Sequence, residues 1–431
     1  MRNWRINKIR ITCVIIIIFL VINCIFINVV HAEEVMGYNE NVKQAFSNID
    51  APNVLLGNTK TGEILYGKNI DEKIYPASLT KLMTAILVVE NCELDEIATV
   101  SENAVRSVPS GYVNANLQVG EELTIEDLLY VMLVPSANDA ANVLAEYVGG
   151  NIESFATMMN TKAKELGCTN TNFTNPSGLH EEAHVSTASD LFLIANEAIK
   201  SDTIKKVIST TKYTLPQTNK YSGESRYFTT TNYLILPNLT KFYTEDCIGG
   251  KTGYTEYAKN CVVEFASKKD IALTIVVLGE SATVKGKKFL DAKEMMEYIF
   301  EKYTIKKIAK KDEEFKTIEI KNATKETKNL KVLYKEDVSI LMENSNIKYN
   351  EKVEYINIEA PIKKEDTIGN IKYNYDGKEY EVELIAGNDV KKSNMYVMVL
   401  IATLIIIIFI IYLFKKSNNN SINLGNHGKN I

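Results

Sequence analysis

A serine and a lysine three residues apart, Ser78 and Lys81, open a segment whose apolar residues recur at helical spacing. Residues i and i+3 share one face of a helix, so the lysine amine can reach the serine hydroxyl. A lysine accepts a proton only if burial or a nearby cation lowers its pKa. Backbone N–H groups at a helix start favour a developing oxyanion. The pair predicts a serine nucleophile with a lysine base, and the alternative for Ser78 is an ordinary helix N-cap.

Two further short motifs follow along the chain. Ser136-Ala137-Asn138 comes after Pro135, which ends a predicted helix, and therefore lies in a loop where side chains can face a cleft. Lys251-Thr252-Gly253 follows two glycines at the head of a predicted strand, where a ligand backbone can approach closely. Alone, Asn138 could be a helix cap and Thr252 a plain strand residue. In this order and these contexts, however, the three motifs are the signature of penicillin-binding proteins and serine β-lactamases.

The elements around these motifs predict the fold. Strands are expected at 54–56 and 64–66, and again at 261–266 and 271–278. Helices are expected at 78–90, at 124–134 with a capping box, from 138 or 139 to Gly149, and at 284–303. Strands at both ends with helices between them predict one sheet sandwiched by helices, an α/β (α+β) fold in which the first and last strands lie side by side.

The two ends of the chain are apolar. Residues 1–32 have a basic start, an apolar core and a small-residue end, which predict a secretory signal peptide, or an uncleaved anchor because the core is long. Residues 395–414 carry no charge and predict a transmembrane helix. We therefore expect a single-pass cell-membrane protein with its bulk on the extracytoplasmic face and a short cytoplasmic tail at 415–431. Residues 304–390, with a hairpin signal at 375–378, predict a small all-β domain.

Composition excludes several classes of protein. The net charge is −5 and no basic block interrupts the middle of the chain, which argues against a nucleic-acid partner. The sequence has no HExxH and no CxxC pair, so we expect neither a metal nor another cofactor. His180 and His184 are expected to be structural. Cys247 and Cys261 could face each other across a hairpin, although four buried free thiols after signal cleavage are favoured.

The motifs lie within longer segments, PASLTKLMTA, LLYVMLVPSANDAANVLAEYVGG, MNTKAKELGCTNTNFTNPSGL and GGKTGYT. These resemble the serine D-alanyl-D-alanine carboxypeptidases, the low-molecular-mass penicillin-binding proteins, over roughly residues 33–303. The β domain and membrane attachment at 304–414 also match that family's layout. The resemblance implies a helix–antiparallel sheet–helix sandwich and a metal-free acyl-enzyme mechanism. It also implies that the substrate is the peptidoglycan stem pentapeptide, and that β-lactam antibiotics acylate the enzyme.

The resemblance also implies roles for single residues. Ser78 would attack the carbonyl of the penultimate D-Ala, with Lys81 as general base and Ser136 as proton relay to the leaving D-Ala. Asn138 would orient Lys81 and the substrate amide. The third motif and its neighbour, Lys251 to Tyr254, would bind substrate. Lys251 would also keep Lys81 partly neutral, and Thr252 would bind the terminal carboxylate beside Gly253. The N–H groups of Tyr254 and Ser78 would together form an oxyanion hole.

One departure from the family concerns the carboxylate. Well-studied members hold it with an arginine on the strand beside the K-T-G strand, and our alignment places Ala272 there, with Lys268 and Lys269 as the nearest cations. We therefore expect Lys251 and Thr252 to carry this recognition. A β-lactamase-like hydrolase is an alternative, but no E-x-x-L-N occurs between Asn138 and Lys251. A non-enzymatic penicillin sensor or wall-binding protein is another, although the tail after the predicted span is short.

Overall fold

The computed structural model describes residues 40–425 apart from 224, 282 and 357. The predicted signal peptide therefore lies outside the described residues. The chain divides into two compact units, one made of residues up to Lys268 with Ala272–Glu297, the other of Lys269–Ile271 with the residues from Tyr298 onward.

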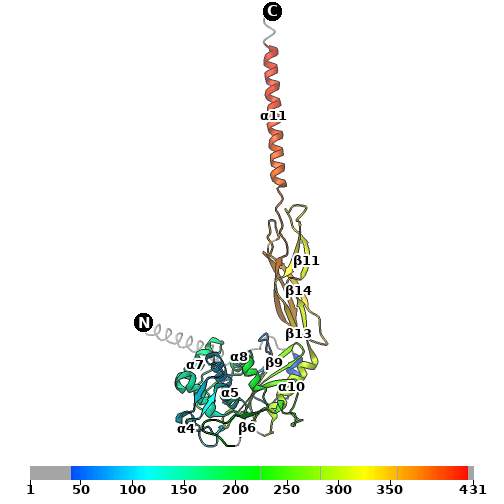
Figure 1. Cartoon of the computed structure of the whole chain (residues 1–431). Coiled ribbons are helices and arrows are strands. Elements are labelled where there is room, and N and C mark those ends of the chain that lie inside the picture. The colour runs from blue at the N-terminus through cyan, green and yellow to red at the C-terminus, as the bar shows by residue number, and fades with distance from the viewer. Residues whose placement is uncertain (1–39, 224, 282, 357, 426–431) are drawn as a thin grey trace, which may run out of the picture. The chain divides into compact units, whose positions relative to one another are not determined.

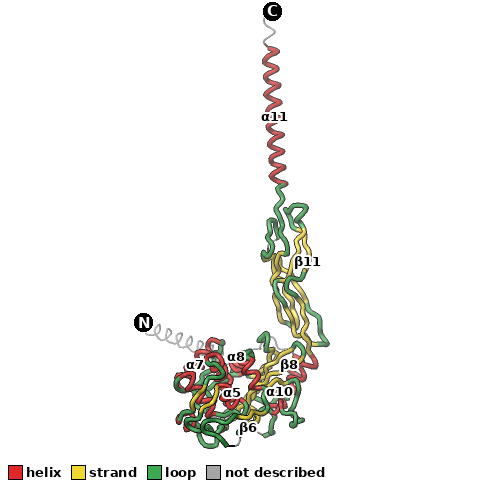
Figure 2. Tube along the Cα trace, viewed as in Figure 1, coloured by secondary structure: helices red, strands yellow, loops and turns green. Residues whose placement is uncertain are grey.

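The first unit is built on a five-stranded sheet (Figures 1 and 2). Its strand order is β2 (Ile64–Lys68), β1 (Asn53–Asn58), β9 (Ile271–Glu280), β8 (Lys259–Lys268) and β7 (Cys247–Thr255). β1 pairs antiparallel with β9, from Asn53 opposite Leu278 to Asn58 opposite Leu273. The predicted pairing of the first and last strands is thus confirmed, and β7 is left at the edge of the sheet.

Helices cover one face of this sheet. Alternate residues of the central strands, among them Leu55, Val276 and Val263, join a buried cluster with the helices that precede β7 in the chain. The elements of the first unit between β2 and β7 are η1 (Ala77–Thr80), α3 (Lys81–Asn91), β3 (Ile97–Thr99), α4 (Glu102–Arg106), β4 (Glu122–Thr124), α5 (Ile125–Leu133), α6 (Asn138–Gly149), α7 (Ile152–Glu165), α8 (Ala188–Ala198), α9 (Asp202–Ile208), β5 (Lys212–Leu215), β6 (Arg226–Thr229) and η2 (Tyr233–Ile235).

The other face of the sheet is buried too. Val54, Ile275 and Val277 alternate with the residues of the first cluster and are fully buried. On this side α10 (Lys287–Lys302) packs its first turn against the edge of the sheet, where the Lys288 amine donates to the carbonyl oxygens of Gly253 and Cys261 at 3.4 and 3.2 Å. With the short helix α2 (Glu40–Ala45) before β1, the unit has the predicted helix–sheet–helix order.

The helix that carries Lys81 lies in the interior. All residues of α3 from Lys81 to Val88 are buried, which explains why its sequence is apolar on every side rather than along one stripe. α5 begins as its capping box predicts, with the Thr124 hydroxyl accepting from the Asp127 N–H at 3.0 Å. α6 is followed by Gly150 at φ +76°, the left-handed conformation that glycine adopts without strain.

The second unit is rich in strands, as expected. A five-stranded sheet has the order β11 (Glu314–Glu319), β12 (Asn329–Tyr334), β16 (Lys378–Ala386), β15 (Thr367–Tyr375) and β14 (Asn350–Tyr355), and β10 (Tyr303–Ala309) pairs with β13 (Val338–Glu343). The predicted hairpin joins β15 to β16 through Asp376 and Gly377, both at positive φ.

The apolar segment near the C-terminus forms helix α11 (Met395–Gly425). Within it, Val397–Lys416 is the one stretch among the described residues that is long and apolar enough to cross a membrane. The helix continues past Phe414 into the predicted tail.

Replacement of Leu82 by alanine tests the importance of α3. Leu82 is fully buried in the helix, so L82A should lower the free energy of unfolding by about 2–5 kcal/mol. Ile97 on β3 is 53% exposed and serves as the matched control, because I97A should change stability by roughly 0.5 kcal/mol or less. Urea unfolding followed by circular dichroism measures both, and equal losses would contradict the placement of α3 in the core.

Candidate active site

Ser78 lies in the short 3-10 turn η1, directly before α3. The sequence predicted the first turn of an α-helix, so the helix begins three residues later than expected. The preceding residue, Ala77, has φ +48°, a conformation that costs an alanine energy and that clusters at functional sites. Ser78 makes no cap hydrogen bond in η1, so the alternative of an ordinary helix cap has no support.

The Lys81 amine donates three hydrogen bonds in a space with no access to solvent. Its acceptors are the hydroxyl of Ser78 at 2.9 Å, the side-chain oxygen of Asn138 at 2.7 Å and the carbonyl oxygen of Ser177 at 2.7 Å. Burial, and then the positive charge of Lys251, hold the pKa of Lys81 well below its usual value, while Asp139 opposes the shift. A neutral amine in this position can accept the serine proton.

Asn138 is the first residue of α6 and has no capping role. The cap position is occupied by Ala137, and no side chain caps the helix. Because its oxygen accepts from Lys81, the amide instead fixes the direction of the lysine side chain. The neighbouring Asp139 is buried and accepts hydrogen bonds from the N–H groups of Ala115 and Leu117, which ties the preceding loop to this helix.

Ser136 and Lys251 form the second serine–lysine contact of the site. Pro135 ends the preceding helical segment, and Ser136 follows at φ +73°, again an uncommon conformation for a residue with a side chain. The buried Lys251 amine donates to the Ser136 hydroxyl at 2.8 Å and to the carbonyl oxygen of Thr252 at 2.9 Å. Burial, with the charge of Lys288, lowers the pKa of Lys251 to about 7.

Gly253 allows the edge strand β7 to lie against the turn that contains Ser78. A Cβ at this position would lie 3.1 Å from the Ala77 Cβ and 3.2 Å from the Ser78 nitrogen. The absence of a side chain therefore brings the backbone of Gly253 and Tyr254 beside the N–H of Ser78. The side chain of Tyr254 is 56% exposed at the rim.

The N-P-S-G-L segment supplies a contact for which sequence reasoning assigned no role. The Asn175 side-chain oxygen accepts from the N–H groups of Gly178 and Leu179 at 2.8 and 3.1 Å, and the resulting turn presents the Ser177 carbonyl to Lys81. Gly178 has φ +80°, and a Cβ there would lie 1.8 Å from the Ala77 carbonyl oxygen. The Asn-Pro and Ser-Gly pairs were the available signal for a tight loop.

The two histidines contact this region without entering it. His184 is buried, and its Nδ1 accepts from the Thr174 N–H at 3.1 Å, so the hydrogen on Nε2 is available to the Thr80 hydroxyl at 2.8 Å. Burial lowers the pKa of His184 to about 4. His180 stacks on Tyr257 with ring centroids 3.8 Å apart. Neither histidine lines the cleft.

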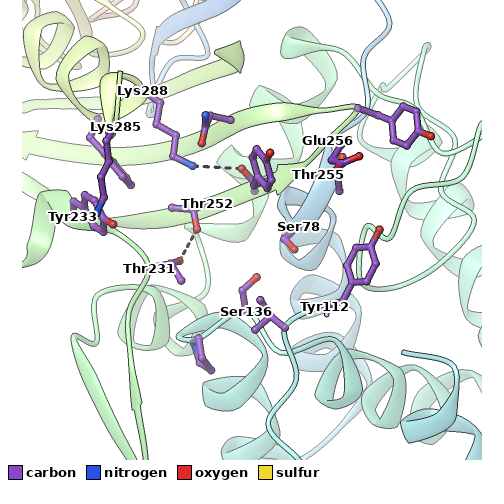
Figure 3. A pocket seen from close by; sticks show the side chains of 18 of the residues that line it. Ser78, Tyr112, Ser136, Thr231, Tyr233, Thr252, Thr255, Glu256, Lys285 and Lys288 are labelled. Carbon is purple, nitrogen blue, oxygen red and sulfur yellow. Dashed lines mark hydrogen bonds between the residues drawn. The ribbon is translucent and has the colours of Figure 1, made fainter. Parts of the chain in front are cut away.

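A cleft of about 740 Å³ opens over Ser78 and Ser136 (Figure 3). Thr252 faces it, and the Thr252 hydroxyl is hydrogen-bonded to that of Thr231. Two lysines that sequence reasoning missed, Lys285 and Lys288, also line the cleft.

Ala272 and the two lysines near it, Lys268 and Lys269, do not line the cleft. Ala272 is on β9, which β8 separates from β7, so the alignment placed it on the wrong strand. Lys268 is paired with Asp246 at 2.8 Å, and neither Lys268 nor Lys269 lines the cleft.

A buried acid lies behind the K-T-G strand. Glu264 on β8 is opposite Gly250, and its carboxylate accepts from the Asn232 amide at 2.6 Å. Burial raises the pKa of Glu264 to about 8. Asn232 is the neighbour of Thr231, so this bond supports the loop that contacts Thr252.

The cysteines of the first unit that the structure describes, Cys92, Cys168, Cys247 and Cys261, are free thiols. Cys247 is opposite Ala266 and Cys261 opposite Gly253, so the possible cross-hairpin disulfide is wrong. The favoured buried thiols are found at Cys168, Cys247 and Cys261, whereas Cys92 is half-buried.

Comparison with known proteins agrees with this geometry. Residues 39–282 match the family model described as D-alanyl-D-alanine carboxypeptidase, and residues 303–392 match the penicillin-binding protein 5 C-terminal domain. The chain is 32% identical to D-alanyl-D-alanine carboxypeptidase DacF of Bacillus subtilis over 80% of this chain and 87% of that protein. The chain belongs to the D-alanyl-D-alanine carboxypeptidase family.

Solved structures confirm the fold class predicted from the sequence. Penicillin-binding protein 5 of Haemophilus influenzae superposes with a TM-score of 0.66 at 26% identity, covering 79% of this chain and 98% of that one. The Streptomyces K15 DD-transpeptidase covers 58% of this chain and 97% of its own, with a TM-score of 0.53 at 33% identity. The protein is thus a hydrolase of the low-molecular-mass penicillin-binding class.

Two glycines at positive φ test the role of the N-P-S-G-L turn. G178A should slow acylation by benzylpenicillin by roughly 10–100-fold, because the clash with Ala77 displaces the Ser177 carbonyl and the turn that contains Ser78. Gly62 has φ +73° with open space around it, so G62A should cost about 1–2 kcal/mol of stability and leave acylation unchanged. Stopped-flow acylation rates measure the difference, and an equal effect of both variants would show that only backbone strain matters.

Proposed function

We propose that the protein removes the terminal D-alanine from peptidoglycan stem pentapeptides through an acyl-enzyme on Ser78. Membership of the carboxypeptidase family supports this activity over the β-lactamase and non-enzymatic alternatives. The proposal rests on the hydrogen bond from the buried Lys81 amine to the Ser78 hydroxyl.

The acylation step follows from this contact. Neutral Lys81 takes the proton from Ser78 as the serine oxygen attacks the carbonyl carbon of the penultimate D-alanine. The N–H groups of Ser78 and Tyr254 stabilise the oxyanion, a contribution of about 3–4 kcal/mol per donor in comparable sites. The intermediate collapses by breaking the C–N bond, and the leaving amine takes a proton delivered through Ser136.

Deacylation uses the same groups in reverse. Lys81, neutral again once its proton has passed to the leaving group, accepts a proton from water, which attacks the ester carbonyl. The serine oxygen leaves and recovers a proton from Lys81. β-Lactams enter the same first step, and the C–N bond that breaks is then the one in their ring.

Recognition of the terminal carboxylate is assigned to the end of the cleft that contains Thr252. The Thr252 hydroxyl, paired with that of Thr231, faces the cleft, and Lys285 and Lys288 supply positive charge there. Lys251 contributes charge from beside Ser136, because its buried amine donates to the Ser136 hydroxyl and to the Thr252 carbonyl rather than lining the cleft.

We further propose that the catalytic unit acts on the extracytoplasmic face of the cell membrane, held by α11. The apolar stretch Val397–Lys416 and the β-rich domain before it support this placement. The domain limits expected from the sequence, with catalysis within 33–303 and the β domain within 304–390, belong to the same proposal.

The nucleophile assignment can be tested by mass spectrometry. Incubation with benzylpenicillin should add one adduct, on the peptide that contains Ser78, and S78A should remove it. Ser209 also begins an S-x-x-K sequence but lies outside the cleft, so S209A is the matched control and should keep the adduct. Labelling of Ser136 or Ser209 in the unmodified protein would contradict the assignment.

The carboxylate site can be tested with a peptide acid and its terminal amide. T252V and K285A should each reduce the preference for the acid in kcat/KM, because they remove a hydrogen-bond donor and a cation from this end of the cleft. K268A should leave the preference intact, because Lys268 is outside the cleft and bound to Asp246. Loss of the preference in K268A alone would place the carboxylate over the β8–β9 turn.

A further inference from the structure

The charges that line the cleft are separated along its length. Figure 3 shows Lys285, Lys288 and Thr252 on one side of Ser78, with Thr255, Glu256 and Tyr112 on the other. Among the described residues lining the cleft, Glu256 is the single carboxylate. The cleft is therefore positive where the substrate carboxylate is assigned and carries one negative charge beyond the nucleophile.

The edge strand gives the bound peptide a direction. β7 has a neighbour on one side only, so its free edge can pair with an extended peptide. With the terminal carboxylate at Thr252 and the penultimate carbonyl at Ser78, the preceding residues run past Tyr254 towards Thr255. An extended chain advances about 3.3 Å per residue, so the residue before the two D-alanines reaches the end of β7, next to Glu256.

The turn that carries Glu256 is anchored on both sides. The Ala258 N–H donates to the Thr255 hydroxyl at 2.9 Å, which closes the turn. Tyr257 stacks on His180, and His180 in turn contacts Tyr75 edge to face at 4.6 Å. Glu256 itself is exposed, and the structure shows it in no ion pair with a described residue. The anchored turn thus places Glu256 on the rim of the cleft, where its exposed carboxylate is available to a ligand.

We propose that Glu256 contributes to substrate specificity by pairing with a free ammonium group on the side chain of the residue that precedes D-Ala-D-Ala. This inference rests on the proposed function, because it uses the peptide orientation set by Ser78 and Thr252. The pair is exposed to water, so its contribution is modest and falls with ionic strength.

Three acetylated tripeptides test the proposal. They end in D-Ala-D-Ala and carry lysine, Nε-acetyl-lysine or norleucine before it. The unmodified protein should cleave the lysine peptide with a kcat/KM about 2–5-fold above that for the two neutral peptides at low salt, the range of an exposed ion pair. The preference should disappear in E256Q and at high salt. Glu153, an exposed acid at the start of α7 and outside the cleft, is the matched control, and E153Q should keep the preference.

Binding to a chain that cannot form the acyl-enzyme separates this inference from the proposed function. Dissociation constants of the same peptides for S78A and for S78A/E256Q require no release of D-alanine. A lysine preference in S78A that E256Q removes supports the role of Glu256, even if the unmodified protein released no D-alanine. Equal affinity of S78A for the three peptides, or a preference that survives E256Q, overturns it. An equal loss for all three peptides in E256Q also overturns it, because the residue would then act through the fold of the turn.

Discussion

Two lysines buried in one small space are the constraint on which the site depends. Lys81 and Lys251 are each almost fully buried, and each donates a hydrogen bond to a serine hydroxyl. Two positive charges excluded from water repel each other strongly, so the site favours the loss of a proton from one of them. The packing thus lowers the pKa of Lys81, through burial first and the charge of Lys251 second, beside the Ser78 hydroxyl.

A third lysine extends this arrangement towards the substrate. Lys288 lies at the positive end of the cleft. Burial is the main cause of the lowered pKa of Lys251 and of Lys81, and the charge of Lys288 adds to the shift of Lys251 as the charge of Lys251 adds to that of Lys81. Glu264 acts in the opposite sense on Lys251 from behind the strand. Under the proposed mechanism, a substrate carboxylate that pairs with Lys288 would also change the charge balance around Lys81, which would couple recognition of the free acid to the chemistry at Ser78.

Much of this could be predicted from the sequence, because motif spacing reports local structure. The i, i+3 spacing predicted that Lys81 contacts Ser78, and Pro135 predicted that the helix ends before a loop at Ser136. Strands at both ends of the unit predicted that the first and last strands pair. Contacts that depend on strand order could not be predicted in this way. The alignment put Ala272 beside the K-T-G strand, whereas β8 occupies that place. The hydroxyls of Thr231 and Thr252 are hydrogen-bonded although the residues are 21 positions apart, and no periodic pattern in the sequence predicts this contact.

Backbone strain is the other feature of the site that composition and periodicity cannot predict. Ala77 and Ser136 have positive φ angles, and each such residue costs on the order of 1–3 kcal/mol. They persist because well-packed neighbours leave no other conformation. Behind Ala77, α3 is buried along most of its length, and Gly178 and Gly253 bring two backbones against the same turn. The strain falls beside Ser78 and at Ser136, the proposed nucleophile and proton relay, where small displacements would matter most for acyl transfer. Packing of the buried neighbours thus offsets the strain and fixes the positions of Ser78 and Ser136. A side chain added at Gly178 or Gly253 would disrupt this packing.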